Sequence, residues 1–465
     1  MNTSANSRRR WLTAALVVGM MSATAPAGAV PAQAGVPAQA GAAPASAKSA
    51  ALARAEATGF AGLKGGHGSG KAVGRSRVTR TARPPVLTPA QRRTLRHASA
   101  MQDLAPKHVR GTPAPRRPRP VSPPIAGAQQ ARPALAKSAA APTDFDYFRA
   151  QNVGPGIGQD SHNEPSVAND GNDVLYTGNF YAAQSTDSGH TFSFLNPFTL
   201  GPTPTLPNGG FCCNQVVIHA PTAGITAWGL MYCPANNCAS GDNLIRLAVA
   251  RNKTDLDADA FDYYDFSAQT FGFPEGDWLG YPQFGVNNDS LILTANVNDS
   301  SGPVDSILVK FNLAAFTTGT WSANWVFNNQ DFTWTPVGNS HDAWTYWAAT
   351  AFGNGGLIRV YNWPPNTDFT HVSWNDFSVS FNSSTLNGSC PAPDGNNWCS
   401  FDDSRVKTGG EVGASTAYFM WDAAQGGGFA YPYVEYASFN VSTGPATSRD
   451  RCARSRSIPA GRARP

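Results

Sequence analysis

The sequence is poor in charged residues and has no long apolar run beyond about Ala25. Charged residues make up 14% of the 465. A helix that crosses a membrane needs about 20 consecutive apolar residues, so the lack of such a run argues against a membrane-spanning protein.

Several catalytic motifs are also missing. The sequence contains no Gly-x-Ser-x-Gly nucleophile elbow, no His-Glu-x-x-His zinc pair and no dinucleotide fingerprint that follows a strand. These absences argue against an α/β-hydrolase, a zinc protease of that type and a nucleotide-dependent oxidoreductase. We therefore expect no cofactor.

The amino terminus has the features of an export signal. Three arginines at Arg8–Arg10 precede an apolar run that reaches about Ala25, and small residues follow. This arrangement is typical of a signal peptide, here with a twin-arginine-like character or one suited to the Sec route. We predict that residues 1–34 are the signal and that the mature protein is secreted.

Charge divides the rest of the chain into two parts. Residues 22–142 hold 18 Lys and Arg against two acidic residues, whereas residues 143–448 hold 8 against 28. Residues 35–142 are also rich in Ala and Pro and almost free of aromatic side chains, which predicts a disordered basic linker. Such an arm could contact an anionic wall polymer or membrane surface, fold back on its own acidic domain, or remain a solvated spacer. The acidic domain is not expected to bind nucleic acid.

Residues 143–447 read as one all-β domain. Runs of four to eight aromatic and β-branched residues are separated by Gly, Asn, Asp and Pro, and no long helical period is present. A unit of about 50 to 70 residues recurs, which is the length of a four-stranded propeller blade. The five predicted units open with strands at residues 164–168, 213–218, 281–286, 344–348 and 404–406.

The segment Ser185–Phe192 has the form Ser-x-Asp-x-Gly-x-Thr-aromatic and is suited to a tight hairpin. It resembles the Asp box (BNR repeat) of sialidase-like β-propellers. The opening strands of the five units, with residues 176–179, extend the likeness to a family of exported bacterial proteins with a sialidase-like six-bladed β-propeller. That resemblance implies a fold with five blades visible in the sequence and a sixth truncated.

The last residues differ from the domain in composition. Residues 448–465 contain six Arg, one cysteine and no aromatic residue. We expect a basic tail in place of the closing blade, produced by a frameshift; a natural basic tail is the alternative.

The sequence contains seven cysteines, and the first of them is Cys212. In an exported protein, Cys233 with Cys238 and Cys390 with Cys399 are plausible disulfides, because each pair flanks a turn-rich segment. The pairing of Cys212 and Cys213 cannot be assigned from the sequence. The histidines of the domain supply no second ligand pair, so no metal is expected.

In a propeller the innermost strand of each blade lines the central channel, so polar residues at its entrance converge. Two aspartates with a tyrosine and an arginine could do acid–base work on a glycosidic bond. The predicted catalytic residues are Asp277, Tyr281, Asp403 and Arg405. The predicted ligand-binding residues are Glu164, Gln215, Asp342 and Tyr346.

A sialidase also needs an arginine cluster to grip the sugar carboxylate. Arg246 and Arg359 lie in apolar–polar alternation, which predicts mid-blade strands where each arginine faces solvent or a cross-strand acid. The leading function is therefore a monomeric propeller that binds carbohydrate or another surface polymer without turnover. A sialidase-type glycoside hydrolase and a non-catalytic structural or protein-binding propeller are the alternatives.

Overall fold

A computed structural model shows an all-β architecture, as the sequence predicts. It describes residues 55–56, 63–82, 88–89, 164–179, 181–202, 210–234, 243–350, 357–378, 405–423, 433–442, 444–446 and 448–454. Within these ranges the α-helices of more than one residue are α2 (Lys253–Asp257) and α3 (Leu313–Thr317). No described helix has the length and hydrophobicity needed to span a bilayer.

Four consecutive antiparallel strands make the body of each of five sheets, which we number I to V. Sheet I holds β5 (Ser166–Asp170), β6 (Asp173–Thr177), β7 (Ala182–Ser185) and β8 (Ser193–Asn196). Sheet II holds β9 (Gly210–Ala220), β10 (Ile225–Cys233), β11 (Leu244–Ala250) and β12 (Ala260–Phe266). Sheet III holds β13 (Trp278–Val286), β14 (Ser290–Asp299), β15 (Gly302–Asn312) and β16 (Thr320–Asn328). Sheet IV holds β17 (Thr335–Pro336), β18 (Thr345–Thr350), β19 (Leu357–Trp363) and β20 (Ser373–Ser378). Sheet V holds β21 (Val406–Val412), β22 (Thr416–Ala423), β23 (Tyr433–Asn440) and β24 (Ser448–Arg454).

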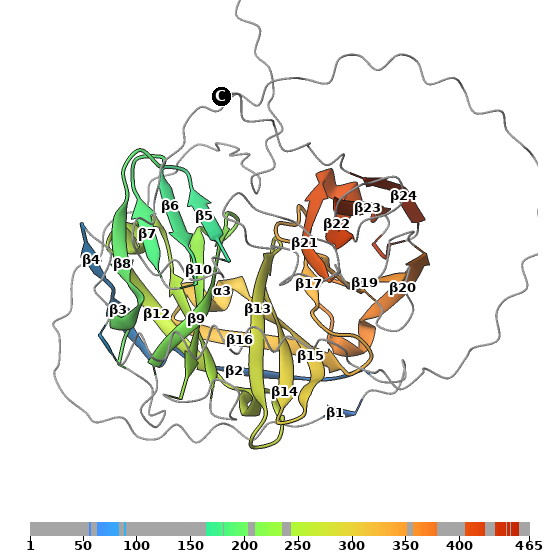
Figure 1. Ribbon diagram of the computed structural model, residues 1–465, viewed down its shortest axis with the longest axis horizontal. Coiled ribbons are helices and arrows are strands. Elements are labelled where there is room, and N and C mark those ends of the chain that lie inside the picture. Colours follow the sequence, from blue (N-terminus) through green and yellow to red (C-terminus); the bar gives the residue numbers. More distant parts are fainter. Residues whose placement is uncertain are drawn as a thin grey trace, which may run out of the picture.

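The sheets follow one another in chain order around the molecule (Figure 1), and the first strands of consecutive sheets are neighbours. The backbone N–H of Val286 at the end of β13 donates to the carbonyl of Gly338, 3.2 Å away, and the N–H of Gly338 donates to Gly409 of β21 at 3.0 Å. Glycine permits this approach, because a Cβ on Gly285 would lie 2.4 Å from the carbonyl oxygen of Val337. The first strands therefore pack at the centre of the molecule.

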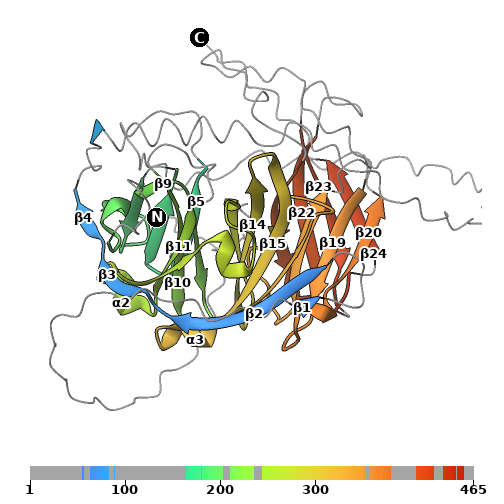
Figure 2. The ribbon, with the colours of Figure 1, turned by 90° about the horizontal axis from the view of Figure 1, so that it is seen from below.

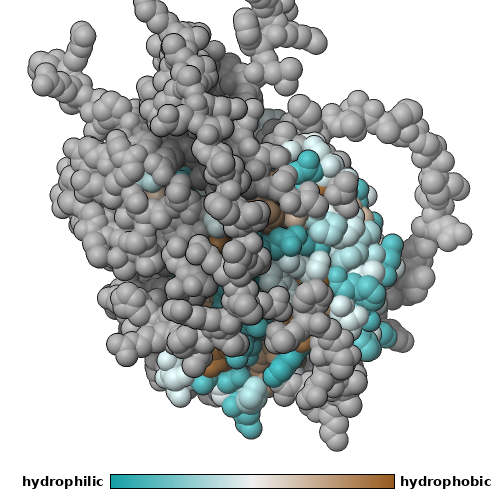
Figure 3. All heavy atoms as spheres, turned by 90° about the vertical axis from the view of Figure 1, so that its right-hand side faces the viewer, coloured by the Kyte–Doolittle hydropathy of each residue, from teal (hydrophilic) through white to brown (hydrophobic). Residues whose placement is uncertain are grey.

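Hydrophobic clusters fill the spaces between consecutive sheets, from I–II through II–III and III–IV to IV–V. Trp228, Trp334, Trp347, Trp363 and Trp421 are among the largest fully buried side chains. Aromatic side chains of this size suit flat sheets that pack face to face. The described surface on the side of β20 and β24 is mainly hydrophilic (Figure 3), and the exposed large hydrophobic residues described are Val73 and Val434.

Part of the segment expected to be a disordered linker is instead folded onto the sheets. Its strands are β1 (Ala55–Glu56), β2 (Lys64–Lys71), β3 (Gly74–Arg77) and β4 (Thr79–Thr81). Strand β2 pairs with β16, β3 with β12 and β4 with β8, so one stretch of chain adds an outer strand to each of sheets III, II and I (Figure 2). The prediction of disorder is wrong for these residues because the outermost strand of a sheet has unpaired backbone groups that another strand can satisfy.

Glycines and charges explain why this segment fits. A Cβ on Gly66 would lie 2.8 Å from the ring of Trp325, and one on Gly70 would lie 2.6 Å from the ring of Trp321. Arg75 forms ion pairs with Asp255 and Asp262, and Arg80 contacts an Asp259 oxygen at 2.5 Å. Residues 64–81 of the basic arm therefore lie against the acidic domain.

The chain after residue 447 also belongs to the fold. Residues expected to begin a basic tail form β24, which pairs with β23 and completes sheet V. The predicted domain boundary at 447 is therefore wrong. The sequence reasoning missed this strand because its arginines lack the hydrophobic alternation that marks a half-buried strand.

Candidate functional site

The site is built at one end of the first strands, where the backbone takes an unusual conformation. Glu164, Asn214, Tyr281 and Thr333 have positive φ angles of 25°, 42°, 55° and 59°. Glu164 and Thr333 lie two residues before the first strands of sheets I and IV, and Asn214 and Tyr281 lie in the first halves of the first strands of sheets II and III. A left-handed conformation costs a non-glycine residue about 1–3 kcal/mol, and such strain clusters at functional sites. We call these four residues together with Arg405, which precedes β21, the rim.

Contacts between the first strands show that the rim residues lie at the same end of their strands. The hydroxyl of Ser166 donates to the carbonyl of Val217 and accepts from its N–H, at 3.3 and 3.0 Å. Val286 and Gly338, each five residues beyond a rim residue, are joined by the hydrogen bond described above. The first strands thus run in the same direction, and their first residues lie at the same end of the molecule.

Buried asparagines of the preceding sheet hold the backbone of the next sheet near this end. The Oδ1 of Asn179 accepts from the N–H of Asn214 at 2.8 Å, and the Oδ1 of Asn296 accepts from the N–H of Thr333 at 2.7 Å. In the same way Asn243 accepts from the N–H of Leu279 at 2.9 Å. The sequence analysis did not predict this role. An asparagine in or just after the second strand of a sheet, as at β6 and β14, is a signal from which it could have been predicted.

Two of the four predicted catalytic residues meet at the rim. The guanidinium carbon of Arg405 lies 4.9 Å from the centre of the Tyr281 ring. This contact joins sheet V to sheet III across the start of sheet IV. Cation–π stacking contributes about 0.5–2 kcal/mol and fixes the plane of the guanidinium. Asp403 lies outside the described residues.

Asp277, the other predicted catalytic residue, lies in the turn that leads into β13. Its side chain is half-buried, and partial burial, reinforced by the charge of Asp299, raises its pKa above the ordinary aspartate value. Its backbone carbonyl accepts from the side-chain amide of Gln269 at 3.0 Å. No described contact joins Asp277 to Tyr281 or Arg405.

Among the predicted ligand-binding residues, Glu164 is exposed at the rim, but Gln215 has a structural role. Gln215 is buried, and its Nε2 donates to the carbonyls of Gly178 and Tyr181 at 2.7 and 3.0 Å. Its Oε1 accepts from the indole of Trp228 at 3.0 Å. Gln215 thus fastens sheet II to sheet I through these hydrogen bonds.

The prediction also misplaced Asp342 and Tyr346, because the first strand of sheet IV is β17 and not residues 344–348. The carbonyl of Asp342 accepts from the N–H of Asn288 at 2.9 Å, beyond the end of β13 that is opposite the rim. Tyr346 is buried on the second strand β18, and its hydroxyl donates to the carbonyl of Gly444 at 2.9 Å. Neither side chain belongs to the rim. The strand Thr335–Pro336 has only two residues and one of them is a proline, so it shows no alternation of apolar and polar residues by which the sequence could predict it.

The interpretation of Arg246 and Arg359 is confirmed. Both lie on the third strands of their sheets, opposite an acid on the fourth. Arg246 forms two hydrogen bonds with Asp265, each 2.8 Å long, and Arg359 forms two with Asp376 at 2.7 and 2.9 Å. No described contact joins either of them to Arg405.

The hairpin predicted between Ser185 and Thr191 joins β7 to β8, away from the first strand of sheet I. The Oδ1 of Asp187 accepts from the N–H of Thr191 and from the hydroxyl of Ser185, both at 2.7 Å, and Gly189 has a φ of 80°. These hydrogen bonds hold the pKa of Asp187 below its usual value. The hairpin is a structural element.

A polar cavity of about 1270 Å³ lies at the opposite end of the first strands from the rim. Its walls come from β2, β15, β16, the β13–β14 turn and the loop before β20, and they include Lys310, Asp289 and Asp368. None of the predicted site residues lines it.

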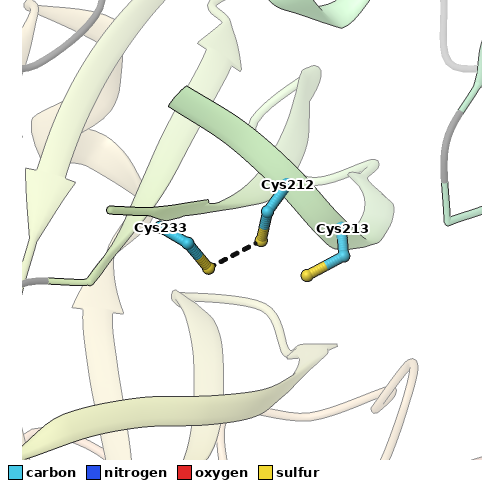
Figure 4. A group of neighbouring side chains, drawn as sticks. All are labelled: Cys212, Cys213 and Cys233. Atoms are coloured by element: carbon cyan, nitrogen blue, oxygen red, sulfur yellow. Dashed lines mark hydrogen bonds between the residues drawn. The ribbon is translucent and has the colours of Figure 1, made fainter. Parts of the chain in front are cut away.

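The described cysteines form one cluster (Figure 4). The sulfurs of Cys212, Cys213 and Cys233 lie within 4.8 Å of one another, and all three side chains are buried. Cys212 and Cys213 carry free thiols, whereas Cys233 is disulfide-bonded. Three sulfurs at such distances could hold a soft metal ion, but the disulfide leaves only two of them as thiols.

Comparisons with known proteins show no family. No family model matches the chain, and no curated protein matches it. Among solved structures, an exo-beta-1,3-galactanase from Clostridium thermocellum is similar over 59% of this chain and 58% of its own, with 12% sequence identity and a TM-score of 0.33.

Proposed function

We propose that the five sheets are blades of a sialidase-like β-propeller whose rim binds a carbohydrate or another surface polymer. The observation that carries this proposal is the meeting of Arg405 and Tyr281 across the starts of the first strands. The rim is strained in four sheets, and at two of these positions the backbone is held by a buried asparagine of the sheet before. Positive φ angles at these residues cost folding free energy, and a ligand-binding site would explain why the chain keeps them.

The chemistry of the rim suits a ligand rich in hydroxyl groups. Arg405 carries planar N–H donors that match hydroxyl and carboxylate oxygens, and the exposed Glu164 carries carboxylate acceptors. The Tyr281 ring adds a partly apolar surface of the kind that packs on a sugar ring. Export through residues 1–34 would place this site outside the cell.

Binding without turnover is favoured over sialidase chemistry. Arg246 and Arg359 are held by cross-strand aspartates, so they are not available to grip a sugar carboxylate beside Arg405. One observation favours the hydrolase as a second candidate: the raised pKa of Asp277 is the direction that a general acid requires.

A glycan array incubated with the purified full chain tests these functions together, read for retained protein and for loss of terminal sugars. Retention without sugar loss supports the binding propeller. Sugar loss that disappears in Asp277→Asn would make the protein a hydrolase. If the array shows neither, and Arg405→Ala changes no readout, a structural or protein-binding propeller replaces both.

A further inference from the structure

The polar cavity opposite the rim lies between sheet III and the loop that joins β19 to β20 of sheet IV. Elsewhere between these sheets, Leu308 and Val326 of sheet III pack with Trp363 of sheet IV in one hydrophobic cluster. Residues two apart along a strand share a face of the sheet, so Lys310 on β15 and Asn324 on β16 lie on this same face. The face of sheet III therefore changes from apolar to polar at the cavity.

Polar side chains cross this face in two rows that follow the strand register. In the first row Lys310 pairs with Asn324, and Asn324 pairs with His67 on β2. In the second row Ser322 pairs with Ser69, and all five residues line the cavity. In the part of the chain that the structure describes, the side chains of Asn324, Ser322 and Ser69 make no hydrogen bond. Their amide and hydroxyl groups can therefore donate to a ligand and accept from it.

The ammonium of Lys310 brings a buried positive charge to this surface. Lys310 is 9% exposed, donates to the carbonyl of Pro364 at 3.2 Å and lies 5.1 Å from the centre of the Trp363 ring. No described acid forms an ion pair with it. An ammonium has three N–H donors, so two remain for a ligand. A buried charge without an ion pair costs folding free energy, and a ligand carboxylate would supply the missing opposite charge.

Two acids that line the cavity limit the charge of such a ligand. Asp289 lies in the β13–β14 turn and Asp368 lies in the loop before β20, and both are exposed. Hydrogen bonds from Thr370 and His371 lower the pKa of Asp368, so its carboxylate is charged at neutral pH. These negative charges repel a second anionic group on the ligand.

We propose that this cavity is a second binding site, separate from the rim, for a hydroxylated monocarboxylate of the size of a sugar acid. The ammonium of Lys310 binds the carboxylate, and Asn324, Ser322 and Ser69 hydrogen-bond the hydroxyl groups. The proposal does not depend on the function of the rim, because the cavity lies at the opposite end of the first strands.

The affinity of this site depends on the protonation of Lys310. Burial lowers its pKa to about 8, and the charge of Asp289 acts in the opposite direction. The other titratable groups among the described lining residues are His67, Asp289 and Asp368. A ligand carboxylate needs the charged amine, so affinity is full below about pH 8 and falls by about tenfold for each pH unit well above it.

Isothermal titration calorimetry of the full chain with four matched compounds tests the proposal. Gluconate carries hydroxyl groups and one carboxylate. Sorbitol lacks the carboxylate, hexanoate lacks the hydroxyl groups, and glucarate carries a second carboxylate. We expect gluconate to bind about tenfold or more tighter than each of the others. Its affinity should fall more than about tenfold between about pH 7 and about pH 9.5, because its own carboxylate stays ionised over that interval.

Lys310→Met should weaken gluconate binding by about tenfold or more and remove its pH dependence. Lys64→Met is the matched control, because this exposed lysine of β2 does not line the cavity, and it should change neither. Asn324→Ala should weaken binding of gluconate and leave that of hexanoate unchanged. Thermal unfolding of each variant confirms that it folds, and the pH profile of the wild type requires no variant.

Three results would overturn the proposal: no binding of gluconate at about 10 mM, equal affinity for gluconate and sorbitol, or unchanged gluconate affinity in folded Lys310→Met. Unchanged gluconate affinity in Asn324→Ala would overturn the assignment of the hydroxyl groups to the polar rows.

Discussion

At the residue scale, Asp187 makes the hairpin of sheet I sensitive to pH. The hydrogen bonds to its carboxylate lower its pKa in the folded protein, so they stabilise the fold above the unfolded aspartate pKa of about 4. We expect Asp187→Asn to lower Tm at neutral pH, and the difference from the wild type to shrink as pH falls below about 4. Thermal unfolding of both proteins across that range measures it; a difference independent of pH would contradict the assignment.

Lys310 makes stability depend on pH in the alkaline range, with the same sign. It is 9% exposed, has no described carboxylate within ion-pair distance, and burial lowers its pKa to about 8. Between about pH 8 and about pH 10.4 the unfolded chain binds a proton that the folded chain does not, so stability from this residue rises with pH. Compared with Lys310→Met, the wild type should gain up to about 3 kcal/mol over that interval.

The free energy of unfolding in urea, measured for both proteins, checks this prediction. The ammonium of Lys310 donates to the carbonyl of Pro364 at 3.2 Å and lies 5.1 Å from the centre of the Trp363 ring, but no described acid pairs with it. Lys310→Met should therefore be neutral or stabilising at neutral pH. A variant that is less stable at pH 7 by more than about 2 kcal/mol would show that the contacts with Pro364 and Trp363 outweigh the cost of burying the charge.

Asn179 tests how the rim is held. Asn179→Ala removes the acceptor for the backbone N–H of Asn214, a buried group, and should cost about 1–3 kcal/mol of folding free energy. Asn172→Ala is a matched control, because the described side-chain hydrogen bond of this exposed asparagine is one that it accepts from the Ser188 hydroxyl. Equal effects of the two substitutions on urea unfolding would argue against the clamp.

At the element scale, the outer strand β2 depends on its glycines. Gly66→Val would place side-chain atoms in the ring of Trp325, whereas Ser69→Val on the same strand adds an exposed side chain with no such collision. Hydrogen exchange should show loss of protection across residues 64–71 in the first variant and retained protection in the second. Equal protection in both would mean that β2 is not paired as described.

The same strand shows where sequence reasoning stops. Turn residues and hydrophobic alternation predicted the hairpin at Ser185–Thr191 and the opening strands of sheets I, II and III, because those signals are local. Strand β2 has no alternation of its own, and its place depends on Trp321 and Trp325, more than 250 residues away. The prediction of the first strand of sheet IV was wrong for a related reason. Thr335–Pro336 is recognised as a strand through its contacts with β13 and β21, which the local sequence does not show.

At the scale of the whole molecule, the separation of charge between the two parts of the chain acquires a structural meaning. Arginines of the basic segment neutralise aspartates of sheet II and its flanking turns, while β2, β3 and β4 bind sheets III, II and I together along one side (Figure 2). The rim lies at the starts of the first strands, far along each sheet from these outer strands. The basic segment therefore supports the sheets, and the rim remains the part of the molecule suited to a ligand.

The most direct test of this account is a double-mutant cycle at the rim. Binding of a glycan retained on the array would be titrated with the wild-type full chain, Tyr281→Ala, Arg405→Ala and the double variant, with the exposed Lys71→Ala as control. We expect each single substitution to weaken binding by about tenfold or more, a coupling of about 0.5–2 kcal/mol between them, and no change in the control. Unchanged affinity in Tyr281→Ala and Arg405→Ala, with both variants folded, would contradict the proposal that the rim binds the ligand.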